Sequence, residues 1–233
     1  MDTVAVVLGA GRGQRLGAGI PKAEVRIQER SLLAWSAAAL GAVPGIDAVL
    51  PVVASLGAPA LAALARDWRG PARLLDPVLG GATRQESLSR GLAAVAVAVP
   101  GASWVAVHDA ARCLVEAADV LPVLAAARAC GAAVPVLPVT DTLKSVRAER
   151  VVGTLERAGL ARVLTPQVFR LALLREALEK AGRDGFEGTD CSSLVERLGA
   201  PVAACVGRAE NFKVTEPADL VRAELLLRAR SRA

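Results

Sequence analysis

The N-terminal stretch that ends at Lys22 constrains this chain most strongly. Residues 4–8 form an apolar run, VAVVL, and residues 9–15, GAGRGQR, follow it directly. A short apolar run rich in β-branched residues predicts a buried strand, and the glycines after it let backbone N–H groups turn toward an anion. Arg15 and Lys22 place two cations beside that loop. The arrangement suits a polyphosphate, although a glycine-rich structural turn remains an alternative for this segment alone.

Two well-known nucleotide-binding loops do not fit this glycine pattern. The dinucleotide-binding loop has G-x-G-x-x-G at the start of a helix, whereas here Gly9, Gly11 and Gly13 alternate and Gln14 follows. A P-loop requires a Gly-Lys pair, and the sequence contains none. The loop is therefore of another kind.

Strand-like and helix-like segments then alternate along the chain. We predict helices at 31–43, 59–68, 83–99 and 118–130, and strands at 48–54, 72–75, 104–108 and 132–137. Thr83 and Glu86 form a capping-box pattern at the start of one helix. Repeated β-α alternation predicts an α/β fold with a Rossmann-like, mostly parallel sheet and helices on both faces. Since such sheets bind ligands at the carboxyl ends of their strands, residues 9–15, 80–82 and Asp109 should share one edge.

The pattern changes after residue 138. Residues 139–145, 151–155 and 161–164 have β character with turn-like residues between them, which predicts a β-arm at about 138–163. After the arm, Thr165-Pro166 predicts the start of a helix. A helix at 189–198, a strand at 201–206 and a final helix capped by Thr215 follow. We expect one domain over residues 1–233.

The composition limits the partners that the chain can have. Its 28 Lys and Arg against 23 Asp and Glu give a net charge of +5, and the basic residues are spread along the chain. Three Trp, three Phe and no Tyr offer little surface for stacking bases, so we expect no nucleic-acid partner. No apolar stretch suggests a membrane span, so we expect no membrane partner. Four widely spaced cysteines without C-x-x-C favour a reducing, cytoplasmic compartment over a zinc or disulfide framework.

Two internal segments carry groups that could serve chemistry. Gly80 and Gly81 lead into a helix N-terminus, where exposed N–H groups favour an anion or the polar edge of a base. Asp109 ends a predicted strand and could hold Mg²⁺ or a ribose hydroxyl, while Arg112 could grip a phosphate or pair with that carboxylate. His108, the only histidine, is more typical of a packed structural residue.

Seven blocks of sequence, taken together, resemble one enzyme family. They are residues 9–15 with Pro21-Lys22, 80–87, 107–112, 141–144, 164–167, 189–190 and 211–215, and the most specific are HDAAR at 108–112 and NFKVT at 211–215. In this order they resemble the 2-C-methyl-D-erythritol 4-phosphate cytidylyltransferases of the non-mevalonate isoprenoid route. The resemblance implies a nucleotidyltransferase fold with a protruding β-arm. It also implies a reaction in which the 4-phosphate oxygen attacks the α-phosphorus of CTP and expels pyrophosphate.

The resemblance further implies roles for individual residues. Arg15 and Lys22 would stabilise the transition state around the CTP phosphates, and Arg157 and Lys213 would hold the attacking phosphate. The remaining contacts would be shared as follows: Ala10, Gly11, Gly81, Ala82 and Ser87 with the cytosine, Asp109 with the ribose or Mg²⁺, and Arg112, Thr142 and Thr189 with the methylerythritol phosphate. Mg²⁺ or another divalent cation would be required. The enzyme would be a homodimer in which the arm reaches the neighbour's site.

A few positions depart from the family pattern, and two alternatives stay open from the residues alone. The departures are Gly9 in place of alanine, Ala82 in place of an acidic residue, Cys113 in place of proline, and Cys191-Ser192 in place of an acidic-alanine pair. None of them is one of the four cations. A basic pocket would equally accept another polyol phosphate, such as ribitol 5-phosphate. A non-catalytic nucleotide- or RNA-binding protein would also use the net positive charge.

Overall fold

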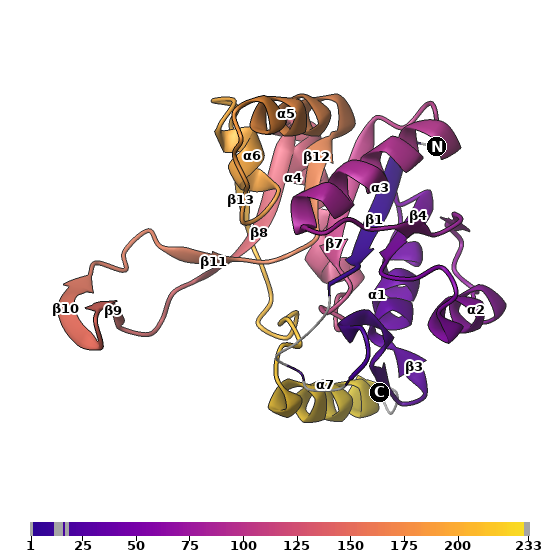
Figure 1. Ribbon diagram of the computed structural model, residues 1–233, viewed down its shortest axis with the longest axis horizontal. Helices are drawn as coiled ribbons and strands as arrows, with labels where there is room; N and C mark the ends of the chain where they lie inside the picture. The colour runs from indigo at the N-terminus through magenta and orange to yellow at the C-terminus, as the bar shows by residue number, and fades with distance from the viewer. Residues whose placement is uncertain (1, 12–15, 17–18, 231–233) are drawn as a thin grey trace.

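The fold is built around one large sheet. The computed structural model describes residues 2–11, 16 and 19–230. In these residues nine strands form the order β11-β8-β12-β7-β1-β4-β5, with β13 paired to β8 and β6 paired to β4 (Figure 1). The strands are β1 (Thr3–Gly9), β4 (Ala48–Val53), β5 (Arg73–Leu74), β6 (Val78–Leu79), β7 (Trp104–Asp109), β8 (Ala132–Pro138), β11 (Ala161–Val163), β12 (Gln167–Arg170) and β13 (Ala203–Val206).

Most strand pairs of this large sheet are parallel, as the β-α alternation predicts. β1 pairs in parallel with both β4 and β7, and β13 pairs in parallel with β8. The exceptions are β12, antiparallel to β7 and β8, and β11, antiparallel to β8. Successive side chains of β1 enter two different cores: Val4 and Val6 lie in one, Ala5 and Val7 in the other. A strand buried on both faces needs apolar side chains in every position, which explains the unbroken run at the N-terminus.

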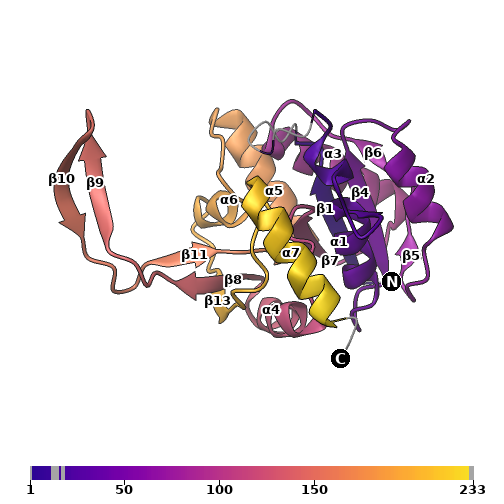
Figure 2. The same ribbon diagram turned by 90° about the horizontal axis from the view of Figure 1, so that it is seen from below.

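Helices cover both faces of this sheet, which confirms the predicted architecture (Figure 2). One core contains residues of α3 (Arg84–Ala98), α5 (Leu171–Arg183) and α6 (Ser192–Glu196). The other contains residues of α1 (Leu32–Gly41), α2 (Pro59–Arg66) and α4 (Ala117–Cys130). No helix in the described part of the chain is long and apolar enough to cross a membrane.

A third, smaller core joins the two ends of the chain. It packs α7 (Pro217–Arg230) against β2 (Arg26–Ile27), which follows η2 (Lys22–Glu24) and pairs with β3 (Arg30–Ser31). Ala223 and Leu227 of α7 lie in this core with Leu32 and Val214. It therefore fixes Lys22 and Lys213, which are 191 positions apart in the sequence, to neighbouring parts of the molecule.

A two-stranded arm projects away from the sheet. β9 (Leu143–Arg147) and β10 (Arg150–Leu155) form an antiparallel hairpin inside the range predicted for the arm. Figures 1 and 2 both show it standing clear of the rest of the chain, joined by the ends of β8 and β11. Its apolar side chains Val146, Val151, Val152 and Leu155 are exposed. An isolated hairpin is marginally stable in water, so the exposed apolar side chains of this hairpin indicate that it packs against another surface.

The prediction that a helix starts at Thr165-Pro166 is wrong. The chain first forms β12, whose Val168 and Phe169 are fully buried between β7 and β8, and α5 begins only at Leu171. A cap followed by proline is typical of a helix start, but here the gap between β7 and β8 is filled by an antiparallel strand. The helix predicted at 189–198 is also shorter, because α6 begins at Ser192.

Two helix starts differ in detail from their predicted capping. Thr83 caps α3 as predicted, since its hydroxyl accepts the N–H of Glu86, but the main backbone donor to the Glu86 carboxylate is the N–H of Ala82. Thr215 does not cap α7 through its side chain, because its hydroxyl donates to the carbonyl of Lys213. The carboxylate of Asp219 accepts the N–H groups of Thr215 and Glu216 instead.

Candidate active site

A cavity of about 550 Å³ opens where the carboxyl ends of β1 and β7 emerge from the sheet. Its walls come from five distant parts of the sequence: residues 8–11, residues 22–23, residues 81–84 with Ser87, residues 109–111, and Lys213. The prediction that the first glycine loop, the second glycine turn and Asp109 share one edge is therefore confirmed for the described residues. Residues 12–15, which include Arg15, lie outside them.

The glycine loops pack too closely for larger residues. A Cβ on Gly80 would lie 2.2 Å from the Cβ of Ala10, and one on Gly9 would lie 2.9 Å from the Cβ of Ala23. The two glycine loops therefore need Gly80 to approach each other, whereas a Cβ at position 9 would require Ala23 to shift. In contrast, no atom of the described residues beyond its chain neighbours lies within 4 Å of a Cβ placed on Gly11. The small residues around it leave that end of the cavity room for a flat ring.

The second glycine turn is held from inside by α3. Ser87 Oγ accepts the N–H of Gly81 at 3.0 Å, and a carboxylate oxygen of Glu86 accepts the N–H of Ala82 at 2.8 Å. Arg90 completes the contact, since it donates to the Gly80 carbonyl at 2.8 Å and pairs with Glu86. Both N–H groups that were expected to face a base therefore already have acceptors in the protein.

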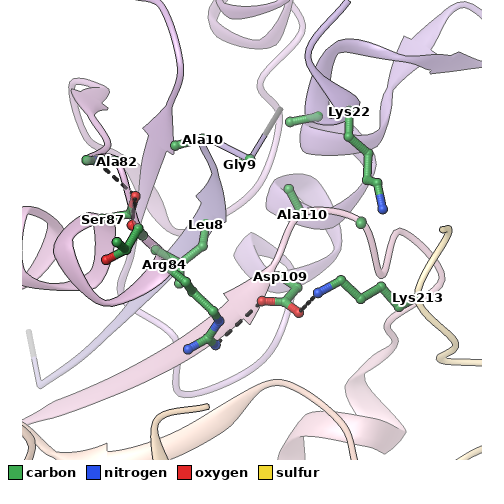
Figure 3. A pocket seen from close by; sticks show the side chains of 15 residues that line it. Leu8, Gly9, Ala10, Lys22, Ala82, Arg84, Ser87, Asp109, Ala110 and Lys213 are labelled. Atoms are coloured by element: carbon green, nitrogen blue, oxygen red, sulfur yellow. Dashed lines mark hydrogen bonds and ion pairs between the residues drawn. The ribbon is translucent and has the colours of Figure 1, made fainter. Parts of the chain in front are cut away.

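Three cations and one carboxylate line the cavity among the described residues. Lys213 Nζ lies 2.8 Å from Oδ2 of Asp109, and Arg84 Nη2 lies 3.5 Å from Oδ1 of the same carboxylate. Lys22 Nζ donates to the carbonyl of Val214 at 2.8 Å, next to Lys213 in the chain. Figure 3 shows Asp109 between Arg84 and Lys213, with Lys22 on the Lys213 side. The cavity therefore carries an excess of positive charge.

Asp109 is a buried carboxylate that stays ionised. Burial by itself would raise its pKa, but the nearby charges of Lys213 and Arg84 outweigh burial and lower the pKa below its ordinary value. Its side chain is only 13% exposed. Asp109 thus presents a fixed negative charge at the cavity wall at any physiological pH.

Arg84 is the site residue that the sequence did not reveal. It is the first residue of α3 and lines the cavity, with its side chain 28% exposed. Its other nitrogen, Nη1, lies 3.4 Å from the sulfur of Cys191, whose thiol pKa is raised by burial. A signal was present in the sequence, because an arginine that directly follows a glycine turn and its cap is well placed to face an anion.

The other predicted residues lie away from the cavity. Arg112 is buried beneath it and donates to the carbonyls of Asn211 at 2.9 Å and Val163 at 3.4 Å. Arg157 lies at the base of the arm, where it donates to the Thr140 carbonyl, and Thr142 is exposed nearby. Thr189 is also exposed and does not line the cavity. The cavity of one chain thus contains Ala10, Gly11, Lys22, Gly81, Ala82, Ser87, Asp109 and Lys213 from the predicted set.

The sequence matches the model of a known protein family. Residues 3–229 match the family described as IspD, 2-C-methyl-D-erythritol 4-phosphate cytidylyltransferase. A curated relative of that name from Thermus thermophilus is 41% identical over 230 residues, which cover 98% of each chain. Another from Syntrophotalea carbinolica is 36% identical over 227 residues, which cover 97% of each chain.

Solved structures agree with the sequence matches. The crystal structure of 2-C-methyl-D-erythritol 4-phosphate cytidylyltransferase from Thermus thermophilus superposes with a TM-score of 0.76 at 40% identity, covering 98% of this chain and 100% of that one. A structure of 4-diphosphocytidyl-2C-methyl-D-erythritol synthase gives a TM-score of 0.80 at 28% identity, covering 97% and 98%.

Proposed function

Because the chain belongs to the 2-C-methyl-D-erythritol 4-phosphate cytidylyltransferase family, we propose that the cavity beside β1 and β7 is where its reaction takes place. The enzyme transfers the cytidylyl group of CTP to the phosphate of 2-C-methyl-D-erythritol 4-phosphate. An oxygen of the 4-phosphate forms a bond to the α-phosphorus, the bond from that phosphorus to the β-phosphate oxygen breaks, and pyrophosphate leaves. The observation that carries the proposal is the convergence of Lys22, Arg84 and Lys213 on one cavity.

The cations answer the main physical difficulty of this reaction. Two anions that repel each other must be held in line while negative charge builds up around the α-phosphorus. Fixed positive charges help both by positioning the reactants and by stabilising the transition state. We assign Lys22 and Arg15 to the CTP phosphates and Lys213 to the attacking phosphate. No step requires a nucleophile from the protein.

The cytosine fits the end of the cavity formed by Ala10, Gly11, Gly81 and Ala82. These small residues line one wall and leave space for a flat ring. Since Ser87 and Glu86 already accept the N–H groups of Gly81 and Ala82, we assign Ser87 the role of shaping the turn. The base would then be recognised mainly by the shape of the two loops and by backbone carbonyl groups.

The residues present fit a divalent cation that is bound largely by substrate. The described residues contain no group of three or more His, Cys, Asp or Glu side chains that could hold a metal ion by themselves. Asp109 is the one carboxylate among the described residues that line the cavity, and Mg²⁺ commonly takes one or two carboxylates together with substrate phosphates and water. We therefore propose Asp109 as the protein's contribution to a Mg²⁺ site. When bound, the ion would neutralise phosphate charge.

The arm suggests how the remaining predicted residues take part. Arg157 and Thr142 do not line the cavity of their own chain, and the arm that carries them exposes several apolar side chains. We propose that two copies pair through their arms, so that each arm brings Arg157 and Thr142 to the acceptor phosphate in the partner's cavity. We also place the enzyme in the cytoplasm, because all four cysteines are free thiols.

A substrate matrix tests the assignment. Four nucleoside triphosphates are combined with several polyol phosphates in the presence of Mg²⁺, and pyrophosphate release is measured. We expect turnover only with CTP and 2-C-methyl-D-erythritol 4-phosphate together. Faster turnover with ribitol 5-phosphate would overturn the acceptor assignment.

A further inference from the structure

His108 is the neighbour of the cavity residue Asp109 in β7, and the sequence analysis assigned no chemical role to it. It is fully buried in β7, one residue before Asp109, and it does not line the cavity. Its ring makes two hydrogen bonds: Nδ1 lies 2.9 Å from the Thr165 hydroxyl, and Nε2 lies 3.2 Å from the Arg112 carbonyl. The ring thus connects the end of β7 to the segment that follows β11.

These contacts define the tautomer of the ring. The Arg112 carbonyl can only accept a hydrogen bond, so Nε2 must carry a hydrogen. In the neutral ring Nδ1 is then an acceptor, and the Thr165 hydroxyl donates to it. The Thr165 oxygen is left with its lone pairs, and it accepts the backbone N–H of Asp109 at 3.1 Å. One imidazole therefore orients a hydroxyl that holds the backbone of the cavity carboxylate.

The same cluster also holds the segment that carries Lys213. The fully buried Asn211 donates from its side-chain amide to the Thr165 carbonyl at 2.8 Å, and its backbone carbonyl accepts from the Arg112 guanidinium at 2.9 Å. Both partners of the Asp109–Lys213 ion pair are consequently anchored to one buried network. The His108 ring, the Thr165 hydroxyl and the Asp109 N–H are all paired in this network, whereas Arg112 Nε and Asn211 Oδ1 have no hydrogen-bond partner among the described residues. Paired buried groups rigidify one another, so the rigid part of the network is the one that runs from His108 through Thr165 to Asp109.

We propose that His108 is a positioning residue for the transfer reaction: through the Thr165 hydroxyl it fixes Asp109 at the cavity wall and so fixes the charges that Asp109 holds. It does not touch substrate. A shift of about 1 Å in the charged groups of a catalytic site can lower the rate by on the order of 10²-fold. We therefore expect the network to affect turnover rather than nucleotide affinity. The inference depends on the proposed role of Asp109.

Two substitutions of His108 separate positioning from packing. His108→Asn places an amide oxygen near the position of Nδ1, where it can still accept from Thr165. His108→Gln places its amide near Nε2 and loses the contact to Thr165. We expect His108→Asn to retain kcat within about 3-fold and His108→Gln to lower kcat by on the order of 10-fold or more, with a smaller change in KM for CTP. Val107→Ala, a truncation of a fully buried neighbour in β7, controls for lost stability.

A double-mutant cycle tests the connection to Thr165. Thr165→Val removes the hydroxyl with little change in shape, and Thr165→Ser keeps it. We expect Thr165→Val to reproduce the loss in kcat of His108→Gln, the double variant to be no worse than either single one, and Thr165→Ser to rescue activity. Additive losses, or losses in kcat that simply follow the loss of stability seen in Val107→Ala, would overturn the proposal.

Two further measurements complete the test. Because the chain has a single histidine, nitrogen NMR on histidine-labelled enzyme at about pH 7.5, well above the ordinary pKa of the ring, reports its tautomer directly. We expect a hydrogen on Nε2 and none on Nδ1, and the reverse would overturn the proposal. Asp109→Asn distinguishes failure of this inference from failure of the proposed site. Full activity in Asp109→Asn would reject the proposed site. Reduced activity in Asp109→Asn together with normal activity in His108→Gln would reject only the role of His108.

Discussion

The ammonium of Lys213 lies 2.8 Å from Oδ2 of Asp109. The two residues are separated by 104 positions, and one ends a central strand while the other lies in the loop before α7. The Asp109 carboxylate is nearly buried, whereas the Lys213 side chain is 43% exposed toward the cavity. Asp109 therefore holds a cation at the surface of the cavity, where a substrate phosphate can meet it.

Lys22→Ala should reduce turnover more than nucleotide binding. A cation that is aimed at charge developing in the transition state stabilises that state more than the ground state. We expect kcat to fall by on the order of 10²-fold or more, with a smaller change in KM for CTP. Steady-state kinetics at saturating acceptor measures both values. Lys180→Ala, which removes a cation of α5 that pairs with Asp184, is the control and should leave both unchanged. A loss confined to KM would mean that Lys22 only binds CTP.

Arg84→Gln should show that the cavity needs its third cation. The substitution removes the positive charge beside Asp109 but keeps a polar, though shorter, side chain. We expect kcat/KM to fall by roughly 10-fold or more, and Arg84→Lys to recover part of that loss because it restores the charge without the fork-shaped donor group. Arg175→Gln on the exposed surface of α5 is the matched control. Equal activity in Arg84→Gln and Arg175→Gln would remove Arg84 from the site.

His108 should make the protein less stable as the pH falls toward 5. Burial lowers the pKa of His108 to about 4 from its ordinary value of 6.5. Between these two pKa values the unfolded chain binds a proton at His108 and the folded chain does not. The stability that the neutral, buried ring contributes is therefore complete above pH 6.5 and is lost as the pH falls. Urea unfolding in the presence of a chelator measures the free energy of unfolding of each protein. As the pH falls through this range, that free energy should decrease in wild type by up to about 1.4 kcal/mol per pH unit more than in His108→Asn. Parallel curves for the two proteins would contradict the neutral, buried state.

Mixed dimers should show whether the arm serves the neighbour's site. A Lys22→Ala chain has a damaged cavity and an intact arm, and an Arg157→Ala chain has the reverse. If each arm completes the partner's cavity, a heterodimer of the two variants contains one intact site, and activity should recover toward about a quarter of wild type after subunit exchange. Each variant mixed with itself is the control. No recovery in dimers shown to be mixed would place Arg157 in the site of its own chain or outside any site.

The sequence predicted the sheet well because its signals are local. The apolar run of β1 and the glycine turns reflect constraints that act within a few residues, and the structure confirms them. The Thr165-Pro166 helix failed because the competing constraint was not local: Val168 and Phe169 fill a gap between β7 and β8. The local signal for a helix start carried no information about that gap.

The site was predictable where residues follow strand ends and harder to predict where contacts are tertiary. Asp109 and the glycine loops meet because parallel strands end at one edge. The position of Arg84 after the glycine turn and its cap was a signal that the sequence analysis did not use, but its ion pair with Asp109, 25 positions away, is tertiary and has no sequence pattern. Arg112 was expected to contact substrate, yet its buried guanidinium donates to the carbonyls of Asn211 and Val163, which no side-chain motif can reveal.

The most direct test is a crystal structure of this enzyme with CTP and Mg²⁺. We predict that the triphosphate lies beside Lys22, that the cytosine lies between the Ala10–Gly11 loop and the Gly81–Ala82 turn, and that Lys213 remains within reach of the α-phosphate. Nucleotide bound anywhere else, for example in the separate groove lined by Ser89 of α3 and Arg175 of α5, with no ligand beside Lys22 and Lys213, would contradict the proposed site.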